Sequence, residues 1–588
     1  HWSLEQHAKA KAFVATSADF PAALRPSAHK SARIAVAQSS PAAWHVQLNQ
    51  AGLKVQADQP YTLTFWAKAD KPLTLTVQLG QAHEPWSALG LDTSVHLATV
   101  WHSHRFVFLA RAADANARLN FTNLAQKKAT VWLAGISLKP GGVIGLGEDE
   151  RLETSSIPAF AHARIGERTA QAQRDWLRFL WETEDAYWQT MQRYLKEDLK
   201  VCGVVMGTIV GCSTPNLMAR LDAVDTHAYW QHPHFPGRQW DMDNWTVANR
   251  TMVNEAGGTL PGLALRRVLG KPHCVTEYNH PAPNTFGSEG FLLLAAYGAL
   301  QDWDAIYAFA YAQGEDWDAR RVQGFFDIAQ HPAKMATLPA AAALFLRGDV
   351  KPAGEQITVS LDRAREIELL RTAHAWDLVH AGQLGVPREA ALIHRVAIAS
   401  DSTAHSQKDV GAKIPKTDAR YVADTGELVW DLRDRKRGVV TINTARSKAV
   451  IGYDGGKRFD LGGTVIEPGA ANQDGWSAIT ITAMEGNFAG LPARLLITAT
   501  GTAENTGMQW QNAAHDSVGR HWGSAPSLVE VIPAVITAPF PAARVRAWAL
   551  DERGQRKTPL KVTEAGDSKA TLTLGESQQT LWYEIELR

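Results

Sequence analysis

Apolar and polar residues alternate along short stretches of the first 141 residues, with polar linkers such as 68–72 between them. The alternating stretches are residues 44–48, 61–66, 73–78, 105–108, 117–121 and 130–138. A period of two places every second side chain on one face of a β-strand, and strands at this spacing are typical of a β-sandwich. The pattern predicts an all-β domain over residues 1–141.

The pattern changes to alternating strands and helices between residues 142 and 350. Residues 175–195 have apolar side chains at helical spacing on one face, which are Trp176, Phe179, Leu180, Tyr187, Met191 and Tyr194. Short apolar runs then occur at 201–208, 223–229, 272–276 and 305–310. The predicted helices between and after them cover about 215–221, 260–269, 288–300 and 333–346. This alternation predicts parallel βα units.

Residues 351–588 return to a strand pattern after a poorly periodic part that ends near residue 400. Runs such as 438–443, 476–482, 494–498 and 580–585 are apolar and are separated by turn residues. They predict one or two β-sandwich domains. The whole chain is therefore expected to be a multidomain α/β plus all-β protein.

Composition narrows the class of function. The 588 residues include 60 basic and 60 acidic ones, so the formal net charge is zero, and no charged block gives electrostatic support for binding nucleic acid or a membrane surface. Three cysteines are too few for a disulfide framework, and no apolar run approaches 18 residues. The 21 tryptophans suit sugar binding, because indole stacks on the C–H faces of sugar rings.

Polar or aromatic side chains stand at the end of each predicted strand of the α/β region. The first strand ends at Thr208, the second carries His227 and Tyr229, and the third ends at Glu277. Tyr311 and Gln313 follow the fourth strand. The carboxyl ends of parallel strands form one mouth, which is where barrel enzymes hold their catalytic residues. Glu277 is therefore the main candidate for a catalytic residue.

The first domain resembles carbohydrate-binding modules of the jelly-roll type. The motifs that match are Trp-x-Val-Gln-Leu at 44–48, Tyr-x-Leu-x-Phe-x-Ala-Lys-Ala at 61–69, and VWLAGISL at 131–138. The resemblance implies a sheet face that binds sugar through amides and aromatic rings. Gln47, Gln78, Trp86 and Asn120 are the residues expected to form that face; the alternative is that they are core or solvated residues.

The α/β region resembles the second half of the (β/α)8 barrel of the clan A retaining glycoside hydrolases, the cellulase-like superfamily. His227-x-Tyr229 matches the end of the sixth strand, and Glu277 matches the nucleophile at the end of the seventh. The eighth strand of that clan usually presents a Trp beneath the sugar. No Trp stands at that position here, and Tyr311 or Trp317 would have to replace it.

The count of strands does not complete such a barrel. Four βα units are predicted where a closed barrel has eight, and the retaining mechanism needs a second carboxylate as acid/base. Asn254-Glu255 is the one Asn-Glu pair, and it does not follow a predicted strand. We expect the first four strands and the acid/base to lie upstream of His1, in another segment or a partner chain, with the β-domain inserted beside the active-site mouth.

The loop after the second strand is rich in Trp and His. His227, His232 and His234 match no strong zinc spacing, so walls of a substrate site are the favoured interpretation, with no metal and no cofactor. The residues expected to contact substrate in this region are Trp230, His232, His234, Trp240, Asn279, His280, Tyr311 and Gln313.

The residues and the resemblance together imply a retaining glycoside hydrolase that cleaves β-linked polysaccharide or oligosaccharide, with β-glucan or mannan expected. Glu277 would be the nucleophile, held by Tyr229, and His227 would contact the sugar or the acid/base. Two alternatives stay open: a carbohydrate-binding protein with an inactive barrel, and a polysaccharide lyase. We expect a secreted or periplasmic protein, although no signal peptide is visible.

Overall fold

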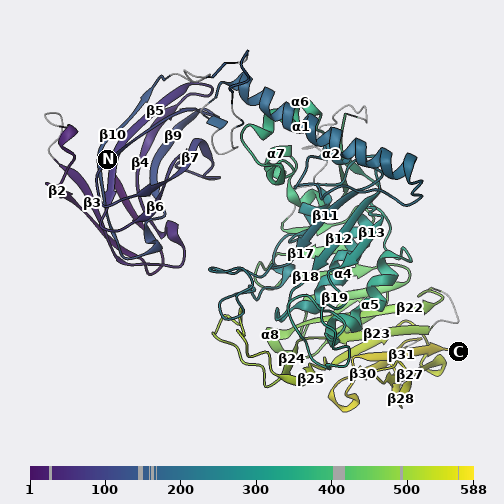
Figure 1. The fold of residues 1–588 in the computed structure, drawn as a ribbon. Helices are drawn as coiled ribbons and strands as arrows, with labels where there is room; N and C mark the ends of the chain where they lie inside the picture. The colour runs from purple at the N-terminus through teal and green to yellow at the C-terminus, as the bar shows by residue number, and fades with distance from the viewer. Residues whose placement is uncertain are drawn as a thin grey trace. The chain divides into compact units, whose positions relative to one another are not determined.

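The computed structural model describes residues 1–588 except 25–29, 143–149, 152, 158, 160–164, 167, 402–417, 490–493 and 567. The chain divides into two compact units. The first contains residues 1–185 and 367–373, and the second contains residues 186–366 and 374–588. Figure 1 shows the order of the elements along the chain. No helix among the described residues is long and apolar enough to cross a membrane.

Two five-stranded antiparallel sheets form the N-terminal β-domain. The first sheet has the order β1 (Ser3–Gln6), β4 (Val46–Val55), β9 (Asp114–Thr122), β6 (Leu73–Gln81) and β7 (Ala88–Leu97). The second has the order β2 (Lys11–Ser17), β3 (Ser31–Gln38), β10 (Thr130–Pro140), β5 (Pro60–Ala69) and β8 (His102–Leu109). Every second residue of β5 is buried, as the period of two predicts. The predicted β-sandwich is confirmed.

The long helix α1 (Ala170–Arg193) forms where the helical spacing predicts it. Its buried residues are Gln173, Leu177 and Trp181. Most of the apolar residues that the sequence placed on one face are exposed, namely Phe179, Leu180, Tyr187, Met191 and Tyr194. The helix is thus predicted correctly, but among the described residues no core covers that apolar face.

Parallel strands and helices alternate in the second unit, as predicted. The sheet has the order β11 (Val224–Tyr229), β12 (His273–Asn279) and β13 (Ala305–Ala308), and both pairings are parallel. The helices are α2 (Pro215–Met218), α3 (Leu260–Ala264), α4 (Gly290–Leu300) and α5 (Pro332–Phe345). Thr214 caps α2 by accepting a hydrogen bond from the Leu217 N–H, and Pro215 occupies its first turn.

The expected half barrel is only partly formed. Within residues 142–350 the described part of the chain makes three parallel strands rather than four, and no (β/α)8 barrel is present among the described residues. Residues 201–208, predicted as a strand, run irregularly beside β11. One backbone bond joins this segment to the turn before β11, from Asp222 N to Val205 O (3.0 Å), and just after the segment Val210 N donates to Asp225 O of β11 (2.8 Å). A strand of a parallel sheet needs hydrogen-bonding neighbours and cover on both faces, and this segment has a strand on one side at most.

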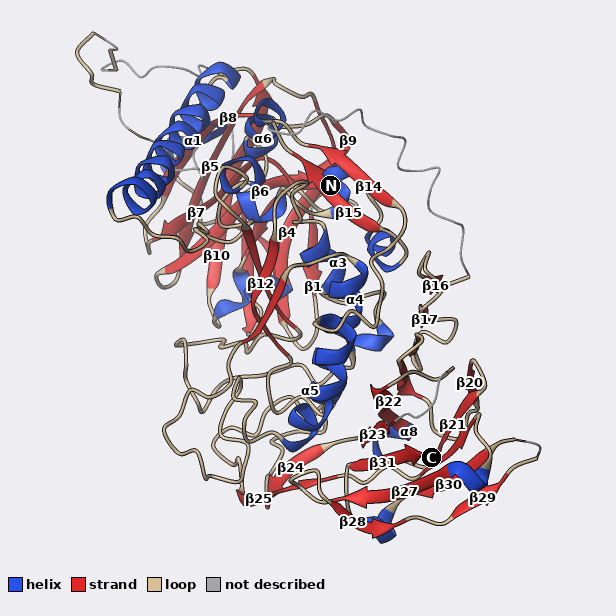
Figure 2. Cartoon of the chain, turned by 90° about the vertical axis from the view of Figure 1, so that its right-hand side faces the viewer, coloured by secondary structure: helices blue, strands red, loops and turns tan. Residues whose placement is uncertain are grey.

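A β-sandwich closes the second unit (Figure 2). Its larger sheet has the order β16 (Arg420–Val422), β17 (Leu428–Asp431), β18 (Val439–Asn443), β19 (Ser447–Tyr453), β22 (Trp476–Glu485), β23 (Arg494–Thr500), β31 (Trp582–Leu587), β27 (Val545–Leu550) and β28 (Arg556–Pro559). Its smaller sheet has the order β20 (Phe459–Leu461), β21 (Thr464–Pro468), β26 (Ala534–Ala538), β30 (Ala570–Leu574) and β29 (Val562–Glu564). One hydrophobic core joins the two sheets.

Smaller elements accompany these sheets. They are the antiparallel pair β24 (Ala503–Thr506) and β25 (Ser524–Val529), the parallel pair β14 (Gln356–Ser360) and β15 (Arg395–Ala399), the helix α6 (Arg363–Leu370), whose last four residues belong to the first unit, and the helices α7 (Ala381–Leu384) and α8 (Asn472–Gly475). The sandwich packs on the α/β part through α5, where Trp582 Nε1 donates to Ala336 O at 2.9 Å. This hydrogen bond joins β31 of the sandwich to α5 of the α/β part.

Candidate functional site

Glu277 opens onto a pocket of about 690 Å³ at the carboxyl ends of β11, β12 and β13. The lining residues are Tyr229, His232, Trp240, Met242, Glu277, Phe309, Gln313, Gly314, Gln323, Gly324, Phe325, Phe326 and Asp327. Parallel strands place their carboxyl ends at one edge, so residues 48 positions apart such as Tyr229 and Glu277 meet there. The pocket combines aromatic walls with amides and carboxylates, which are the groups that bind sugar faces and hydroxyls.

Tyr229 and His227 both contact one oxygen of Glu277. The Tyr229 hydroxyl donates to Glu277 Oε2 at 2.6 Å, and His227 Nδ1 lies 3.4 Å from the same oxygen. The Glu277 side chain is 33% exposed, so it faces the pocket while its orientation is fixed from one side. A carboxylate held in this way keeps its second oxygen free to react.

His227 is in turn oriented by Asp225 and Thr276. The Thr276 hydroxyl donates to Asp225 Oδ2 at 2.6 Å, so its oxygen accepts from His227 Nε2 at 2.8 Å. His227 Nε2 also lies 3.1 Å from Asp225 Oδ2. The Thr276 oxygen and Asp225 Oδ2 both accept hydrogen bonds at this position. His227 Nε2 therefore carries a proton whether the imidazole is neutral or charged. The Asp225 carboxylate thus helps to fix the orientation of the His227 imidazole, as carboxylates paired with histidine generally do.

The environment shifts the pKa of two of these groups. Burial, together with the hydrogen bond to Glu277 and its charge, raises the pKa of the Tyr229 phenol well above its usual range. Burial alone would raise the pKa of Asp225, but hydrogen bonds from His227 and Thr276 outweigh it and lower that pKa. Tyr229 is thus a neutral donor and Asp225 a charged acceptor over the ordinary pH range.

The structure brings together several of the residues that the sequence singled out. Tyr229, Glu277, His232, Trp240 and Gln313 all line the pocket. Tyr311 is 55% exposed, its ring centre lies 6.0 Å from that of Trp317, and it is not among the residues that line the pocket. His234 is exposed and does not line the pocket; its backbone pairs with that of Thr246.

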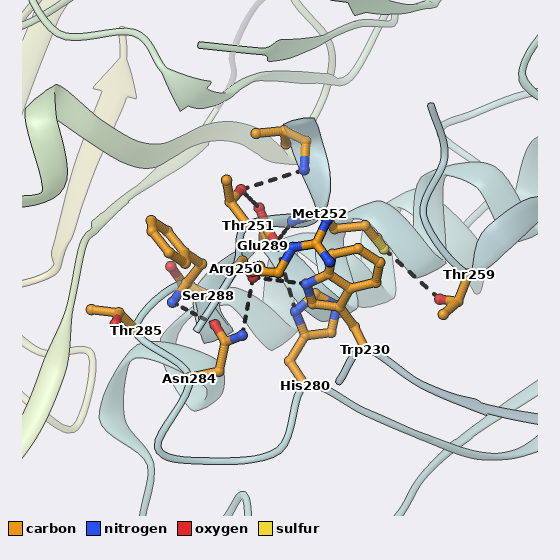
Figure 3. A network of polar contacts seen from close by, with 12 residues as sticks. Trp230, Arg250, Thr251, Met252, Thr259, His280, Asn284, Thr285, Ser288 and Glu289 are labelled. Carbon is orange, nitrogen blue, oxygen red and sulfur yellow. Dashed lines mark hydrogen bonds and ion pairs between the residues drawn. The ribbon is translucent and has the colours of Figure 1, made fainter. Parts of the chain in front are cut away.

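Three residues expected to contact substrate are buried instead, and the prediction is wrong for them. Trp230 is 3% exposed and donates through Nε1 to Arg250 O at 2.8 Å. His280 is 1% exposed, with Tyr278 Oη 3.0 Å from its Nε2 and Glu289 Oε1 3.8 Å from its Nδ1. Figure 3 shows both side chains within a buried network around Glu289.

Asn279 is the third of these residues, with no exposed surface. Its Nδ2 donates to the carbonyls of Phe309 and Phe326 at 2.6 Å each, and its Oδ1 accepts from the buried Lys334 ammonium at 2.9 Å. From the sequence, polar residues near the end of a strand were expected to line the mouth of the site. In the structure they instead form hydrogen bonds with buried backbone groups. Asn279 holds two residues of the pocket wall rather than a ligand.

Sequence reasoning missed a second group of pocket residues. Phe309, Phe325, Phe326 and Asp327 line the pocket, and Asp225 supports His227 beneath it. The alternation Asp225-x-His227-x-Tyr229 on one strand was a signal that could have revealed Asp225. The Gln323-Gly-Phe-Phe-Asp327 run lies in a long loop, and no pattern in the sequence indicated where that loop folds back.

One carboxylate other than Glu277 lines the pocket among the described residues, and it is Asp327. Asp327 is 6% exposed, and its Oδ1 accepts a hydrogen bond from the Gln313 N–H at 2.6 Å. Its role in holding the loop is therefore evident from this contact. Among the described residues, no group of three His, Cys, Asp or Glu side chains is arranged to hold a metal ion.

The N-terminal β-domain carries a separate polar face on the sheet that contains β4, β9, β6 and β7. Asn49, Asn120, Gln78 and Asp92 stand in register across these four strands. Their neighbours Leu48, Phe121 and Val77 point into the core, so these polar side chains face outward. Gln78 Nε2 donates to Asp92 Oδ2 at 3.1 Å.

Two side chains of this face are buried, yet have an oxygen atom without a hydrogen-bond partner among the described residues. Asn120 Oδ1 and Thr122 Oγ1 are these atoms. Asn120 uses its Nδ2 to donate to Gln47 Oε1, which places Gln47 in the network but leaves it only 6% exposed. Buried polar atoms are usually paired, so unpartnered ones mark positions where a ligand hydroxyl would bind.

Trp86 lies on a loop joining β6 and β7 and is 50% exposed. The guanidinium of Arg118, on β9, lies 5.0 Å from the centre of its ring. Of the predicted sugar-contacting residues in this domain, Gln78 and Trp86 are accessible, whereas Gln47 acts mainly by holding Asn120. The exposed indole is suited to stacking on a sugar ring beside the polar face.

Comparisons with known proteins bear on the N-terminal domain. Residues 11–126 match the family described as "Carbohydrate binding domain", and solved carbohydrate-binding modules are among its structural neighbours. One, described as "CBM4 structure and function", is 24% identical and covers 24% of this chain and 86% of its own, with a TM-score of 0.20. The N-terminal cellulose-binding domain of β-1,4-glucanase C from Cellulomonas fimi is 22% identical, covering 19% of this chain and 80% of its own, with a TM-score of 0.17.

A third neighbour is the CBM22-1 xylan-binding domain of Xyn10C from Paenibacillus barcinonensis. It is 11% identical and covers 24% of this chain and 85% of its own, with a TM-score of 0.18. No curated protein matches the chain. The family match thus identifies a carbohydrate-binding module at the N-terminus, in agreement with the resemblance seen in the sequence.

Proposed function

We propose that the protein is a retaining glycoside hydrolase acting on a β-linked polysaccharide or oligosaccharide, with β-glucan or mannan as the substrate class to test first. The observation that carries the proposal is the connected set of Asp225, His227, Tyr229 and Glu277, of which Tyr229 and Glu277 line one pocket. The carbohydrate-binding domain at the N-terminus supports a carbohydrate substrate.

In the proposed reaction Glu277 is the nucleophile. One of its oxygens attacks the anomeric carbon, the bond to the leaving oxygen breaks, and a second carboxylic acid gives that oxygen a proton. The glycosyl ester is then hydrolysed by water, which transfers a proton back to the second carboxylate. The anomeric configuration is inverted twice and is therefore retained.

Tyr229 and His227 orient the nucleophile in this proposal. The neutral Tyr229 hydroxyl keeps one Glu277 oxygen in place, which leaves the other directed to the pocket. Because the hydrogen bond is weaker once the carboxylate becomes an ester, Tyr229 also helps the glycosyl group to leave in the second step. Phe309, Phe325 and Trp240 provide apolar walls against sugar faces.

A mechanism-based inactivator tests the nucleophile directly. A 2-deoxy-2-fluoro glycoside with a good leaving group should glycosylate the nucleophile and release that leaving group, and peptide mass spectrometry should find the added mass of the sugar on Glu277. Proton NMR of early products should show the retained anomer. An inverted product, a mass on another residue, or full activity of Glu277→Gln would contradict the proposal. Glu255→Gln, at an exposed carboxylate paired with Arg250, is the matched control.

A non-catalytic carbohydrate-binding protein is the second candidate. It is favoured by one observation: the carboxylate that accompanies Glu277 in the pocket is Asp327, which is buried and engaged with the backbone of residue 313. In affinity electrophoresis, β-glucan or mannan in the gel should then slow the migration of the chain. If this binding occurs, but no assembly that contains the chain hydrolyses the polysaccharide or is labelled by the fluoroglycoside, the second function is the correct one.

A further inference from the structure

We propose that the C-terminal β-sandwich holds a further carbohydrate site, which binds a sugar ring carrying a carboxylate or sulfate group. The site is a pocket of about 620 Å³ lined by residues of β16, β17, β18 and β20 and of the loops 432–438 and 454–458. Among the described residues, none lines both this pocket and the pocket at Glu277. The proposal therefore goes beyond the proposed hydrolase function and does not depend on it.

Part of the pocket lining is apolar. Val439 of β18 and Leu461 of β20 belong to the hydrophobic core that joins the two sheets, and Phe459 packs against that core while staying partly exposed. β20 is the last strand of the smaller sheet, whereas the larger sheet continues past β18 to β17 and β16. The core is thus accessible at this end of the sandwich, and the C–H face of a sugar ring can cover it.

Charged side chains make up most of the remaining lining. The five basic ones are Arg420, Arg433, Arg437, Lys457 and Arg458, and the three acidic ones are Asp431, Asp434 and Asp460. Arg433 Nε donates to Asp431 Oδ1 at 3.0 Å, and Arg420 Nε lies 3.8 Å from Asp431 Oδ2. Because the basic side chains outnumber the acidic ones, the pocket favours an anionic ligand.

Arg437 and Lys457 are the cations that a ligand can neutralise. One Arg437 Nη donates to Asp474 O at 2.6 Å, and the guanidinium lies 5.2 Å from the centre of the Tyr453 ring. These contacts hold the guanidinium in place but leave its charge without a counter-ion. Lys457 is exposed, and in the part of the chain that the structure describes neither side chain forms an ion pair with a carboxylate. An anionic group with two or more oxygens can accept hydrogen bonds from both.

The loops that carry these two cations are fixed by backbone contacts. Tyr453 N donates to Gly438 O at 3.0 Å, and Gly455 N donates to Gly475 O at 2.9 Å. The second pair lies so close that a Cβ on Gly455 would be 2.9 Å from Gly475 Cα. A site whose loops are already ordered loses less conformational entropy when a ligand binds.

The acidic side chains of the pocket select an acidic sugar over other anions. Asp434 Oδ1 accepts from Lys436 N at 3.0 Å, and Asp460 Oδ1 accepts from Gly463 N at 2.8 Å, so each carboxylate has a second oxygen for a sugar hydroxyl. A nucleic acid has a phosphate at every unit and would meet these carboxylates with like charge. The carbohydrate-binding domain at the N-terminus also favours a carbohydrate ligand.

Calorimetry with a matched pair of sugars tests the requirement for negative charge. A glucuronan tetrasaccharide and cellotetraose share the β-1,4 linkage, and they differ in carrying carboxylates or hydroxymethyl groups. Both are titrated into the full chain with Trp86→Ala, which weakens binding by the N-terminal domain. The acidic sugar should bind about tenfold more tightly, and a rise in salt from about 0.05 M to about 0.5 M should reduce this difference. Equal binding of the two sugars would overturn the proposal.

Two variants locate the binding. Lys457→Gln and Arg437→Gln should each raise the Kd for the glucuronan tetrasaccharide about fivefold or more, because each removes a charge-assisted hydrogen bond. Lys561→Gln, at an exposed lysine of the same sandwich that does not line the pocket, is the matched control and should leave the Kd unchanged. Thermal unfolding of each variant checks that the fold is intact. An unchanged Kd in Lys457→Gln, whose exposed side chain can be replaced without disturbing the fold, would refute the inference.

Other anions separate an acidic sugar from simpler ligands. Sodium sulfate that binds as tightly as the tetrasaccharide would show a site for an adventitious ion only, and duplex DNA that competes equally well would show a general polyanion surface. Either result would contradict the proposal. A sulfated galactan tetrasaccharide, compared with the glucuronan tetrasaccharide, shows whether sulfate or carboxylate is the group recognised, since the tighter of the two identifies it.

Discussion

The Tyr229 hydroxyl and Glu277 Oε2 are 2.6 Å apart, and this contact joins the ends of two adjacent parallel strands. The Tyr229→Phe change removes it while leaving the ring in the pocket wall. A hydrogen bond to a charged group contributes about 1.5–3 kcal/mol, so kcat/KM should fall about 10- to 100-fold. Steady-state kinetics on the preferred β-glucan or mannan provide the measurement.

The pH profile distinguishes this role of Tyr229 from a general structural one. Because the pKa of Tyr229 is raised above its usual range, the phenol should cause no alkaline limb near pH 10 in the native protein. An alkaline limb near pH 10 that is lost in Tyr229→Phe would show that the phenol ionises there and would contradict this expectation.

Asp225 is expected to act through His227. Asp225→Asn replaces the charged acceptor beneath Nε2 and Thr276 with an amide of the same shape, so the imidazole loses its fixed orientation. Loss of an outer orienting group of this kind costs about 10- to 100-fold. We expect kcat to fall by this amount with little change in KM. Asp222→Asn, at a carboxylate near the surface that pairs with Lys196, should leave both constants unchanged.

The buried Glu289 should make the stability of the α/β part depend on pH. Burial raises its pKa to about 8, although Thr251 and the Met252 N–H donate to it. Between the unfolded value of 4.5 and about 8 the folded state binds more protons, so the free energy of unfolding falls as pH rises through this window. The loss is on the order of a few kcal/mol.

Glu289→Gln should flatten that dependence, because an amide matches the neutral carboxyl group but does not ionise. Hydrogen exchange of the α4 amides at pH 5 and pH 7 measures it in both proteins. The buried His280 and Lys334 also have lowered pKa values, and comparing the two proteins at each pH cancels their contribution. If the free energy of unfolding depends on pH in the same way in the variant and the native protein, burial does not raise the pKa of Glu289.

Trp86 should dominate binding by the N-terminal domain. Its ring is half exposed beside the row Asn49, Asn120 and Gln78, and an aromatic contact at the centre of a site is worth about 2 kcal/mol or more. Trp86→Ala should therefore raise the Kd for the bound carbohydrate about 30-fold or more in calorimetry. Trp44→Ala, at an indole 49% exposed beside His45, is the control and should change the Kd by less than about twofold.

The sequence by itself determined the type of most of the elements that its periodic stretches predicted. Period-two alternation predicted the N-terminal sandwich, and short apolar runs predicted β11, β12 and β13 with helices between them. These predictions are correct because the spacing of apolar residues indicates whether an element is buried on one face or on both. Glu277, Tyr229 and His227 were also found this way, since strand ends can be located from the sequence.

Only the tertiary structure decided which polar residues near those ends face a ligand. Asn279, His280 and Trp230 follow the same strands as Glu277 and Tyr229, yet they turn inward because buried carbonyls and a buried carboxylate need partners. Phe325, Phe326 and Asp327 enter the pocket from a loop whose path no periodicity encodes. Residues 201–208 have the pattern of a strand but lack the neighbour that would make them one, because pairing depends on contacts beyond the segment itself.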